Sequence, residues 1–200
     1  MVLVVATRNR GKLREIAEML GGFGIEIRSP DDFPGAPEPV EDADTYRGNA
    51  LIKARALRDH SGFAALADDS GLEVDSLDGA PGVVSARFAG PEQDPAKNRT
   101  ELLRATAGVP EGKRAARFVC VIALALPGGD EHVFEGECKG TITTEERGSS
   151  GFGYDPIFFF PELGKTFAEL DPATKNRVSH RARALKKLKE AIRSGQLPLA

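Results

Sequence analysis

The feature that most constrains the fold is a short apolar run followed at once by a helical pattern. Residues 2–6 are entirely apolar, which is typical of a strand inside a sheet. After a polar turn, apolar residues recur at the spacing of a helix that buries one face: Leu13, Ile16, Ala17 and Leu20. A strand and a helix in so short a segment predict a sheet covered by helices.

The same alternation continues along the chain. Helical patterns are expected at 45–60, 94–107 and 181–193, the first capped by Asp44, and strand-like runs at 25–27, 64–67, 117–126 and 131–136. Residues 29–44 contain four Pro and several acids, so they predict a loop. Residues 127–130 read Pro-Gly-Gly-Asp, which indicates a hairpin and a sheet that is not purely parallel. The predicted fold class is α/β, with a mixed β-sheet flanked by helices.

Length and charge exclude several classes of protein. Two hundred residues suit one domain, and we expect residues 1–200 to form it. The net charge of −3 argues against general nucleic-acid binding. No run approaches the ~20 apolar residues of a membrane span, and the first apolar run is too short for a signal peptide. We expect a cytoplasmic protein in which Cys120 and Cys138 are buried, reduced thiols.

The first candidate site lies between the first strand and helix, at Thr7-Arg8-Asn9-Arg10-Gly11-Lys12. A helix N-terminus presents free N–H groups and a partial positive charge, which suit phosphate, and Lys12 would add charge. The alternative is a polar turn in which Asn9 or Thr7 caps the helix. The spacing is not that of a Walker loop.

The second candidate is Asp68-Asp69-Ser70-Gly71, directly after an apolar run. Adjacent carboxylates repel each other unless a cation or a donor lies between them. Carboxylate oxygens suit Mg²⁺, which usually takes one or two of them together with phosphate oxygens. A further ligand could come from the preceding loop, from Glu38, Glu41 or Asp42. The alternative is a solvated acidic turn.

Two candidates lie in the last third of the chain. In Gly151-Phe152-Gly153-Tyr154-Asp155-Pro156, glycines flank an aromatic ring that could stack on a base. Asp155 could accept a hydrogen bond from a ring N–H of that base. The alternative is a turn with Phe152 in the core. Lys175-Asn176-Arg177-Val178-Ser179-His180-Arg181 is a cluster of donors for an anionic or carbonyl-rich ligand. The alternative there is that Ser179 or His180 caps the last helix.

Together these segments resemble one family. The motifs occur in its order: Thr7-x-Asn9-x-x-Lys12, Asp68-Asp69-Ser70-Gly71-Leu72, Gly79-Ala80-Pro81-Gly82, Ser85-Ala86-Arg87, Gly151-Phe152-Gly153-Tyr154-Asp155-Pro156 and Ser179-His180-Arg181. Over nearly its whole length the chain is similar to the inosine/xanthosine triphosphate pyrophosphatases. Arg8, where many members have glycine, and Arg177, at a position that is often small or apolar, depart from the pattern.

The resemblance implies a homodimer of two-lobed α/β subunits with a central substrate cleft, which hydrolyses dITP, ITP and XTP with Mg²⁺. The segment from Thr7 to Lys12, with Lys53, would bind the triphosphate. Asp69 would be the general base and a metal ligand, with Glu41 as a second ligand, Asp68 as a supporting or ligating acid and Ser70 touching substrate. Phe152, with Gly153 and Tyr154 beside it, would stack on the base. Base recognition would fall to four residues: Asp155, Lys175, His180 and Arg181.

Two alternatives stay open at this stage. One is a nucleoside triphosphate pyrophosphatase with a different modified-base preference. The other is a non-catalytic nucleotide-binding protein, against which the presence of Lys12 and Asp69 speaks.

Overall fold

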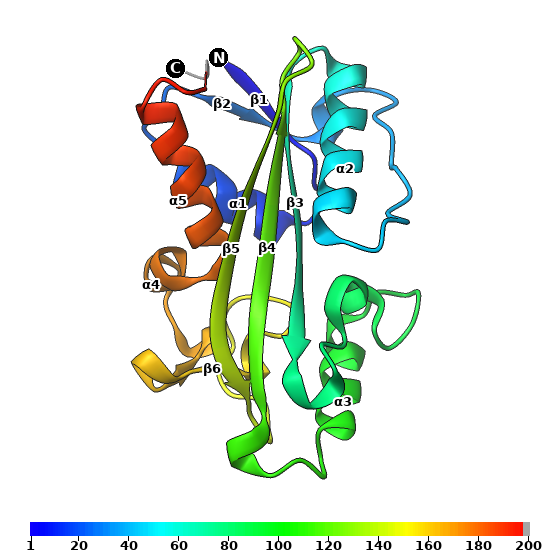
Figure 1. Ribbon diagram of the computed structural model, residues 1–200, viewed down its shortest axis with the longest axis vertical. Coiled ribbons are helices and arrows are strands. Elements are labelled where there is room, and N and C mark those ends of the chain that lie inside the picture. Colours follow the sequence, from blue (N-terminus) through cyan, green and yellow to red (C-terminus); the bar gives the residue numbers. More distant parts are fainter. Residues whose placement is uncertain (198–200) are drawn as a thin grey trace. The chain divides into compact units, whose positions relative to one another are not determined.

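The computed structural model describes residues 1–197 and has the predicted α/β class. Its strands are β1 Val2–Val5, β2 Glu26–Arg28, β3 Ala64–Val74, β4 Ala115–Ala125, β5 Glu131–Ile142, β6 Phe158–Phe160 and β7 Lys165–Thr166. Its α-helices are α1 Arg10–Leu20, α2 Tyr46–Ser61, α3 Pro95–Ala105, α4 Pro172–Val178 and α5 His180–Arg193 (Figure 1). Short 3₁₀ turns, including Gly82–Arg87, connect several of these elements.

The strands form one seven-stranded mixed sheet in the order β2-β1-β3-β4-β5-β6-β7. β1 pairs in parallel with β2 and with β3, where Val5 lies opposite Leu66. β6 pairs antiparallel with β5 and with β7, and Phe159 lies opposite both Thr141 and Thr166. The mixed sheet confirms the expectation that the strands are not purely parallel.

The described residues divide into two compact units. The first holds residues 1–69, 120–136 and 181–197, and the second holds 70–119 and 137–180. β3, β4 and β5 therefore contribute residues to both units. That residues 1–200 act as one domain stays a prediction, and its last three residues lie outside the described range.

The core of the first unit joins the sheet to two helices. Leu3 of β1, Leu66 of β3 and Ile122 of β4 are fully buried in one cluster with helical side chains. Ile16 of α1 and Leu188 of α5 supply those side chains, so α1 and α5 cover the same face of the sheet. The helical periodicity seen in the sequence at both ends of the chain is therefore a core-facing stripe.

The core of the second unit is rich in phenylalanine. The ring of Phe118 in β4 lies 4.5 Å from that of Phe158 in β6, measured between centroids, and Phe158 lies 4.9 Å from Phe167. Leu72 of β3 and Leu102 of α3 complete the same cluster. This core supports the glycine-rich segment before β6, since Tyr154 belongs to the cluster.

The structure corrects two element boundaries that affect the site. The apolar run at 64–67 does not end in a turn, because β3 continues through Asp68 and Asp69 to Val74. β5 likewise extends beyond residue 136 to Ile142. Both corrections have one cause: the neighbouring strands satisfy backbone groups of polar residues that single-sequence patterns favour in turns.

Two helix starts and one loop also differ from expectation. α2 is capped by Thr45, whose side chain accepts from the Gly48 N–H, and not by Asp44. Residues 172–178, for which the sequence patterns predict no element, form α4. Ser179 is the C-cap residue of α4, with its N–H donating to the Lys175 carbonyl, so it ends one helix directly before α5 starts at His180.

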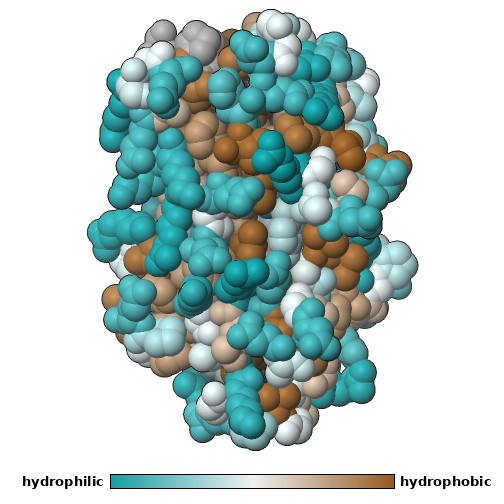
Figure 2. All heavy atoms as spheres, in the orientation of Figure 1, coloured by the Kyte–Doolittle hydropathy of each residue, from teal (hydrophilic) through white to brown (hydrophobic). Residues whose placement is uncertain are grey.

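Within residues 1–197, no helix is long and apolar enough to cross a membrane. Figure 2 shows charged and polar side chains over most of the visible face, with hydrophobic ones in smaller groups. Both cysteines are buried and unbonded to each other, as expected.

Candidate active site

The segment after β1 forms the capped N-terminus of α1. The Asn9 side chain accepts from the N–H groups of Gly11 and Lys12, at 2.9 and 3.1 Å, and the Thr7 hydroxyl accepts from the Asn9 N–H at 3.1 Å. The capping role considered for Asn9 is thus confirmed. It shapes a helix N-terminus with a partial positive charge, at which Lys12 adds a full one.

Asp68 and Asp69 point to opposite faces of β3, because side chains alternate along a strand. That both carboxylates bind metal stays a prediction. Each carboxylate has its own cation: Asp68 faces Lys12, and Asp69 faces Lys53. The strand geometry resolves the repulsion that two adjacent acids would otherwise suffer.

Asp68 lies at the centre of a buried charge cluster. Its carboxylate accepts from Arg181 Nε at 2.9 Å and pairs with Lys12 Nζ at 2.5 Å, and it also accepts from the Cys120 thiol at 3.0 Å. Arg181 Nη1 also donates to Glu15 at 2.5 Å. Burial opposes the charged form of Asp68, yet Arg181 and Lys12 hold its pKa well below the usual range. The cluster fixes Lys12 at the start of α1.

Asp69 has the properties of a poised base. Its Oδ1 accepts from Lys53 Nζ at 2.8 Å, and Lys53 also donates to Glu41 at 2.9 Å. Asp69 Oδ2 is buried and accepts no hydrogen bond from residues 1–197. Burial raises the pKa of Asp69 to about 6, although Lys53 acts in the opposite direction. An oxygen without a donor is where a water or a cation would bind.

Of the three loop acids considered, Glu41 lies near Asp69, because Lys53 forms an ion pair with both carboxylates. Glu38 lies 3.9 Å from Arg8, which also pairs with Asp31, and Asp42 is exposed. Lys53 and Lys12 hold the pKa of Glu41 below its ordinary value despite partial burial. Glu41 is therefore ionised and able to act as an oxygen ligand at neutral pH.

The acids fit an Mg²⁺ site that substrate completes. In the described part of the chain, no three His, Cys, Asp or Glu side chains gather into a full metal cage. Mg²⁺ needs no such cage, because it usually combines one or two carboxylates with substrate phosphates and waters. The unsatisfied oxygen of Asp69 and the charged Glu41 supply suitable donors. Asp68 is engaged by cations on its own face, which suits a supporting acid.

In the second unit, three predicted residues come together. Lys175 Nζ donates to Asp155 Oδ2 at 2.6 Å and lies 4.5 Å from the centroid of the Phe152 ring. Asp155 Oδ2 also accepts from the Phe152 N–H at 2.8 Å. The lysine and Asp155 are buried while Phe152 is partly exposed. A ring held this way by a charged pair and a backbone bond is suited to serve as a stacking platform for a planar group.

Tyr154 and His180 both pack in the phenylalanine-rich core of the second unit. The Tyr154 hydroxyl donates to the Ser85 carbonyl at 2.7 Å, and burial raises its pKa, so it stays a neutral donor. The His180 ring stacks on Phe118, with centroids 4.6 Å apart and 14° between planes. Tyr154 thus lies in the core and joins Ser85 of the Gly82–Arg87 turn to the glycine-rich loop.

The remaining predicted residues lie as follows. Arg10 is exposed at the start of α1, Gly11 follows within the helix, Ser70 is half-buried in β3, and Gly153 has the left-handed backbone, with φ of 60°. The sequence reasoning missed Glu15. Its spacing from Lys12, i to i+3 on one helix face, was the available signal. It also missed Arg99, whose contacts are described below.

These features are typical of the class of α/β nucleotide hydrolases: Lys12 at a helix N-terminus and the buried Asp69 lie in the first unit, and the Phe152 ring lies in the second. The model of the Ham1 family matches residues 3–191, and the chain belongs to this family. It is 53% identical to a dITP/XTP pyrophosphatase of Desulforamulus reducens, covering 96% of both chains, and 52% identical to that of Geobacter sulfurreducens, covering 95% and 96%.

Solved structures agree. A HAM1 protein from Coxiella burnetii is 39% identical, with a TM-score of 0.88 over 97% of this chain and 99% of that one. The nucleoside-triphosphatase / dITP/XTP pyrophosphatase of Mycobacterium abscessus is 46% identical, with a TM-score of 0.76 over 94% and 98%. The fold predicted from the sequence is the fold of this family.

Proposed function

We propose that the protein hydrolyses non-standard purine nucleoside triphosphates, namely dITP, XTP and ITP, to the monophosphate and pyrophosphate. The observation that carries the chemistry is Asp69, a buried carboxylate with an unsatisfied oxygen beside Lys53. The relatives named dITP/XTP pyrophosphatase, at about half identity over nearly the full length, support the substrate class.

The residues of the first unit suit the triphosphate. Lys12 and the partial positive charge at the N-terminus of α1 attract phosphate oxygens, and Lys53 stabilises charge that develops on them. Asp69 accepts a proton from the water that attacks the α-phosphorus, which breaks the bond to the leaving pyrophosphate. Asp69 and Glu41 would hold Mg²⁺, which withdraws charge from phosphate oxygens when bound.

The residues of the second unit suit the base. Phe152 stacks on it, and the pair of Asp155 and Lys175 offers an acceptor and a donor in fixed positions. His180 is a further donor for the 6-oxygen of hypoxanthine or xanthine. Adenine carries an amino group there, so donor would face donor. A site built on such pairing rejects the mismatched base strongly. Arg181 belongs to the first unit, where its buried guanidinium donates to Asp68 and Glu15, so its expected role in base recognition stays a prediction.

Product analysis tests the reaction. With Mg²⁺ and a panel of dITP, XTP, ITP, ATP, GTP and dUTP, we expect monophosphate and pyrophosphate in equal amounts, fastest for the first three. Orthophosphate with a diphosphate as initial products would contradict attack at the α-phosphorus. Preference for a different modified base would indicate a pyrophosphatase of another specificity. Binding without turnover would indicate a non-catalytic nucleotide-binding protein.

We also propose that the chain acts as a homodimer in the cytoplasm, as the resemblance implies. Sedimentation at micromolar concentration is expected to give about twice the chain mass of 21.4 kDa. A single species at the monomer mass would exclude the dimer.

A further inference from the structure

The loop between β5 and β6 carries the stacking platform and is bound to neighbouring segments: the Thr166 hydroxyl of β7 donates to the Arg147 carbonyl, and the Ser150 N–H donates to the Ala168 carbonyl. Backbone bonds close its base, from the Thr143 N–H to the Ile157 carbonyl and from the Arg147 N–H to the Pro156 carbonyl. Nearer its tip, Gly153 has φ of 60°, and a side chain there would meet no atom within 4 Å. The backbone at Gly153 is therefore not held by packing around its Cα, and a hydrogen bond from outside the loop would add order there.

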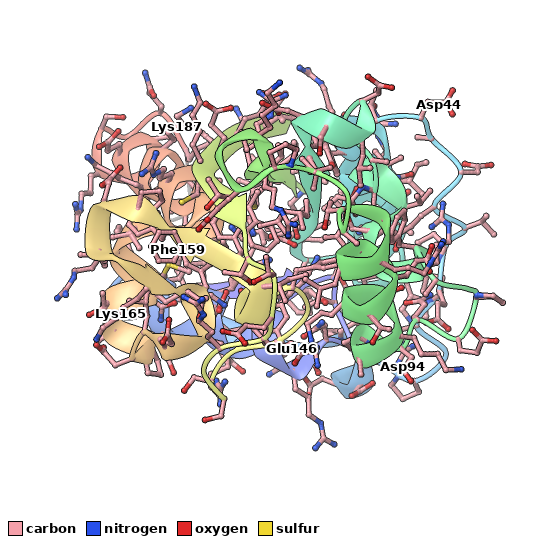
Figure 3. All side chains as sticks on the ribbon, turned by 90° about the horizontal axis from the view of Figure 1, so that it is seen from below. Asp44, Asp94, Glu146, Phe159, Lys165 and Lys187 are labelled. Atoms are coloured by element: carbon pink, nitrogen blue, oxygen red, sulfur yellow. The ribbon has the colours of Figure 1, made fainter. Side chains whose placement is uncertain are left out.

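Arg99 of α3 supplies such a restraint. Its Nη1 donates to the Gly153 carbonyl at 3.0 Å, and its Nε donates to Glu146 Oε1 at 2.9 Å. The two acceptors lie on the two arms of the same loop, and Figure 3 shows Glu146 beside α3. The planar guanidinium presents donors in a fixed fork, so one side chain ties both arms to the helix.

The two contacts of Arg99 differ in strength. The Arg99 side chain is 16% exposed, whereas that of Glu146 is 43% exposed. An ion pair with an exposed partner contributes little, because water and salt screen it. A charged donor on a partly buried carbonyl contributes more. The bond to Gly153 is therefore the main restraint, and Glu146 orients the guanidinium.

The helix that carries Arg99 is itself anchored on the same side. The neighbouring Asn98 is buried; it donates to the Ala86 carbonyl at 2.8 Å and accepts from the Ala89 N–H at 2.7 Å. The residue after Gly153, Tyr154, donates to the Ser85 carbonyl. Gly153 is thus bound to α3 and Tyr154 to the segment 85–89, and Asn98 joins α3 to that segment.

We propose that Arg99 is a positioning residue for the base platform: it locks the tip of the loop so that Phe152 and Asp155 meet the base without rearrangement. This role rests on the proposed function, because the base is what the platform would bind. Preordering a binding loop improves affinity by lowering the entropy lost on binding. Loss of Arg99 should therefore weaken binding of the base and leave the chemistry at the phosphates unchanged.

The test compares Arg99→Gln, Arg99→Lys and a matched control, Arg104→Gln. Arg104 lies on the same helix, but it is largely exposed and pairs only with Glu101 within that helix among the contacts described. The measurements are KM and kcat for dITP, and competitive inhibition by inorganic tripolyphosphate, which has no base. Hydrogen–deuterium exchange of residues 148–155 is measured without ligand.

For Arg99→Gln we expect a KM for dITP raised about tenfold, kcat within twofold of normal and unchanged tripolyphosphate inhibition. Loop amides should exchange at least tenfold faster. Arg99→Lys should recover part of the KM, and Arg104→Gln should behave as wild type. Normal KM and normal exchange in Arg99→Gln would overturn the proposal, as would equal weakening of dITP and tripolyphosphate. If the wild-type protein released no pyrophosphate from dITP, the proposed function would fail, while loop exchange would still decide the role of Arg99.

Discussion

Replacing Arg181 by methionine should destabilise the protein far more than the same replacement of an exposed lysine or arginine. The guanidinium is 1% exposed and pairs with Asp68 and Glu15, whose side chains are 0% and 10% exposed. Methionine fills much of the same volume but leaves two buried carboxylates with less compensation. Removing one partner of a buried ion pair typically costs about 3–5 kcal/mol in the free energy of unfolding. Lys12 still faces Asp68, so we expect the lower part of that range.

Urea denaturation and calorimetry measure this effect. In a protein of this size, each kcal/mol corresponds to about 2–4 °C, so Tm should fall by roughly 6–15 °C. Lys187→Met is the matched control, because Lys187 lies on the exposed side of the same helix (Figure 3). Its Tm should change little. Adding Glu15→Gln to Arg181→Met should restore part of the stability, since it removes one of the two carboxylates that Arg181 no longer compensates.

Two outcomes would refute this reasoning. An Arg181→Met variant within about 1 kcal/mol of wild type, well below the cost of breaking a buried ion pair, would show that the cluster contributes little. Further destabilisation on adding Glu15→Gln would show that the charge of Glu15 does not destabilise the Arg181→Met variant.

Three further predictions concern activity. Asp69→Asn should lower kcat by ~10²–10⁴-fold with a smaller effect on nucleotide binding, because general-base catalysis typically contributes this much; near-normal kcat at saturating Mg²⁺ would exclude the role. In wild type, kcat/KM should fall as the pH drops through about 6. Below its raised pKa, Asp69 is protonated and no longer accepts a proton from water. A profile flat from pH 5 to 8 would contradict this. Phe152→Ala should raise KM for dITP, XTP and ATP alike, since stacking does not distinguish bases; a loss confined to one base would show that the ring contributes to selectivity.

Local features of the site followed from the sequence because their causes are local. Asn9 caps α1 through the N–H groups of residues two and three positions ahead, and such contacts depend on short-range backbone geometry. The glycine-rich loop was predicted for the same reason. The prediction that the strand ends at residue 67 was wrong. The two acids that follow are part of β3 because the neighbouring strands pair with their backbone.

The amino-acid sequence alone determined the alternation of strands and helices, the Asn9 cap with Lys12 at the start of α1, and the family motifs. Only the tertiary structure decided which charges meet: Arg181 reaches Asp68 across 113 positions of the chain and Glu15 across 166. The parallel pairing of β1 with β3 brings the start of α1 to Asp68, and the alternation of side chains sends Asp69 to Lys53. Periodicity reports which residues are buried on one element, but partners far apart in the chain depend on strand order and on which face each helix covers.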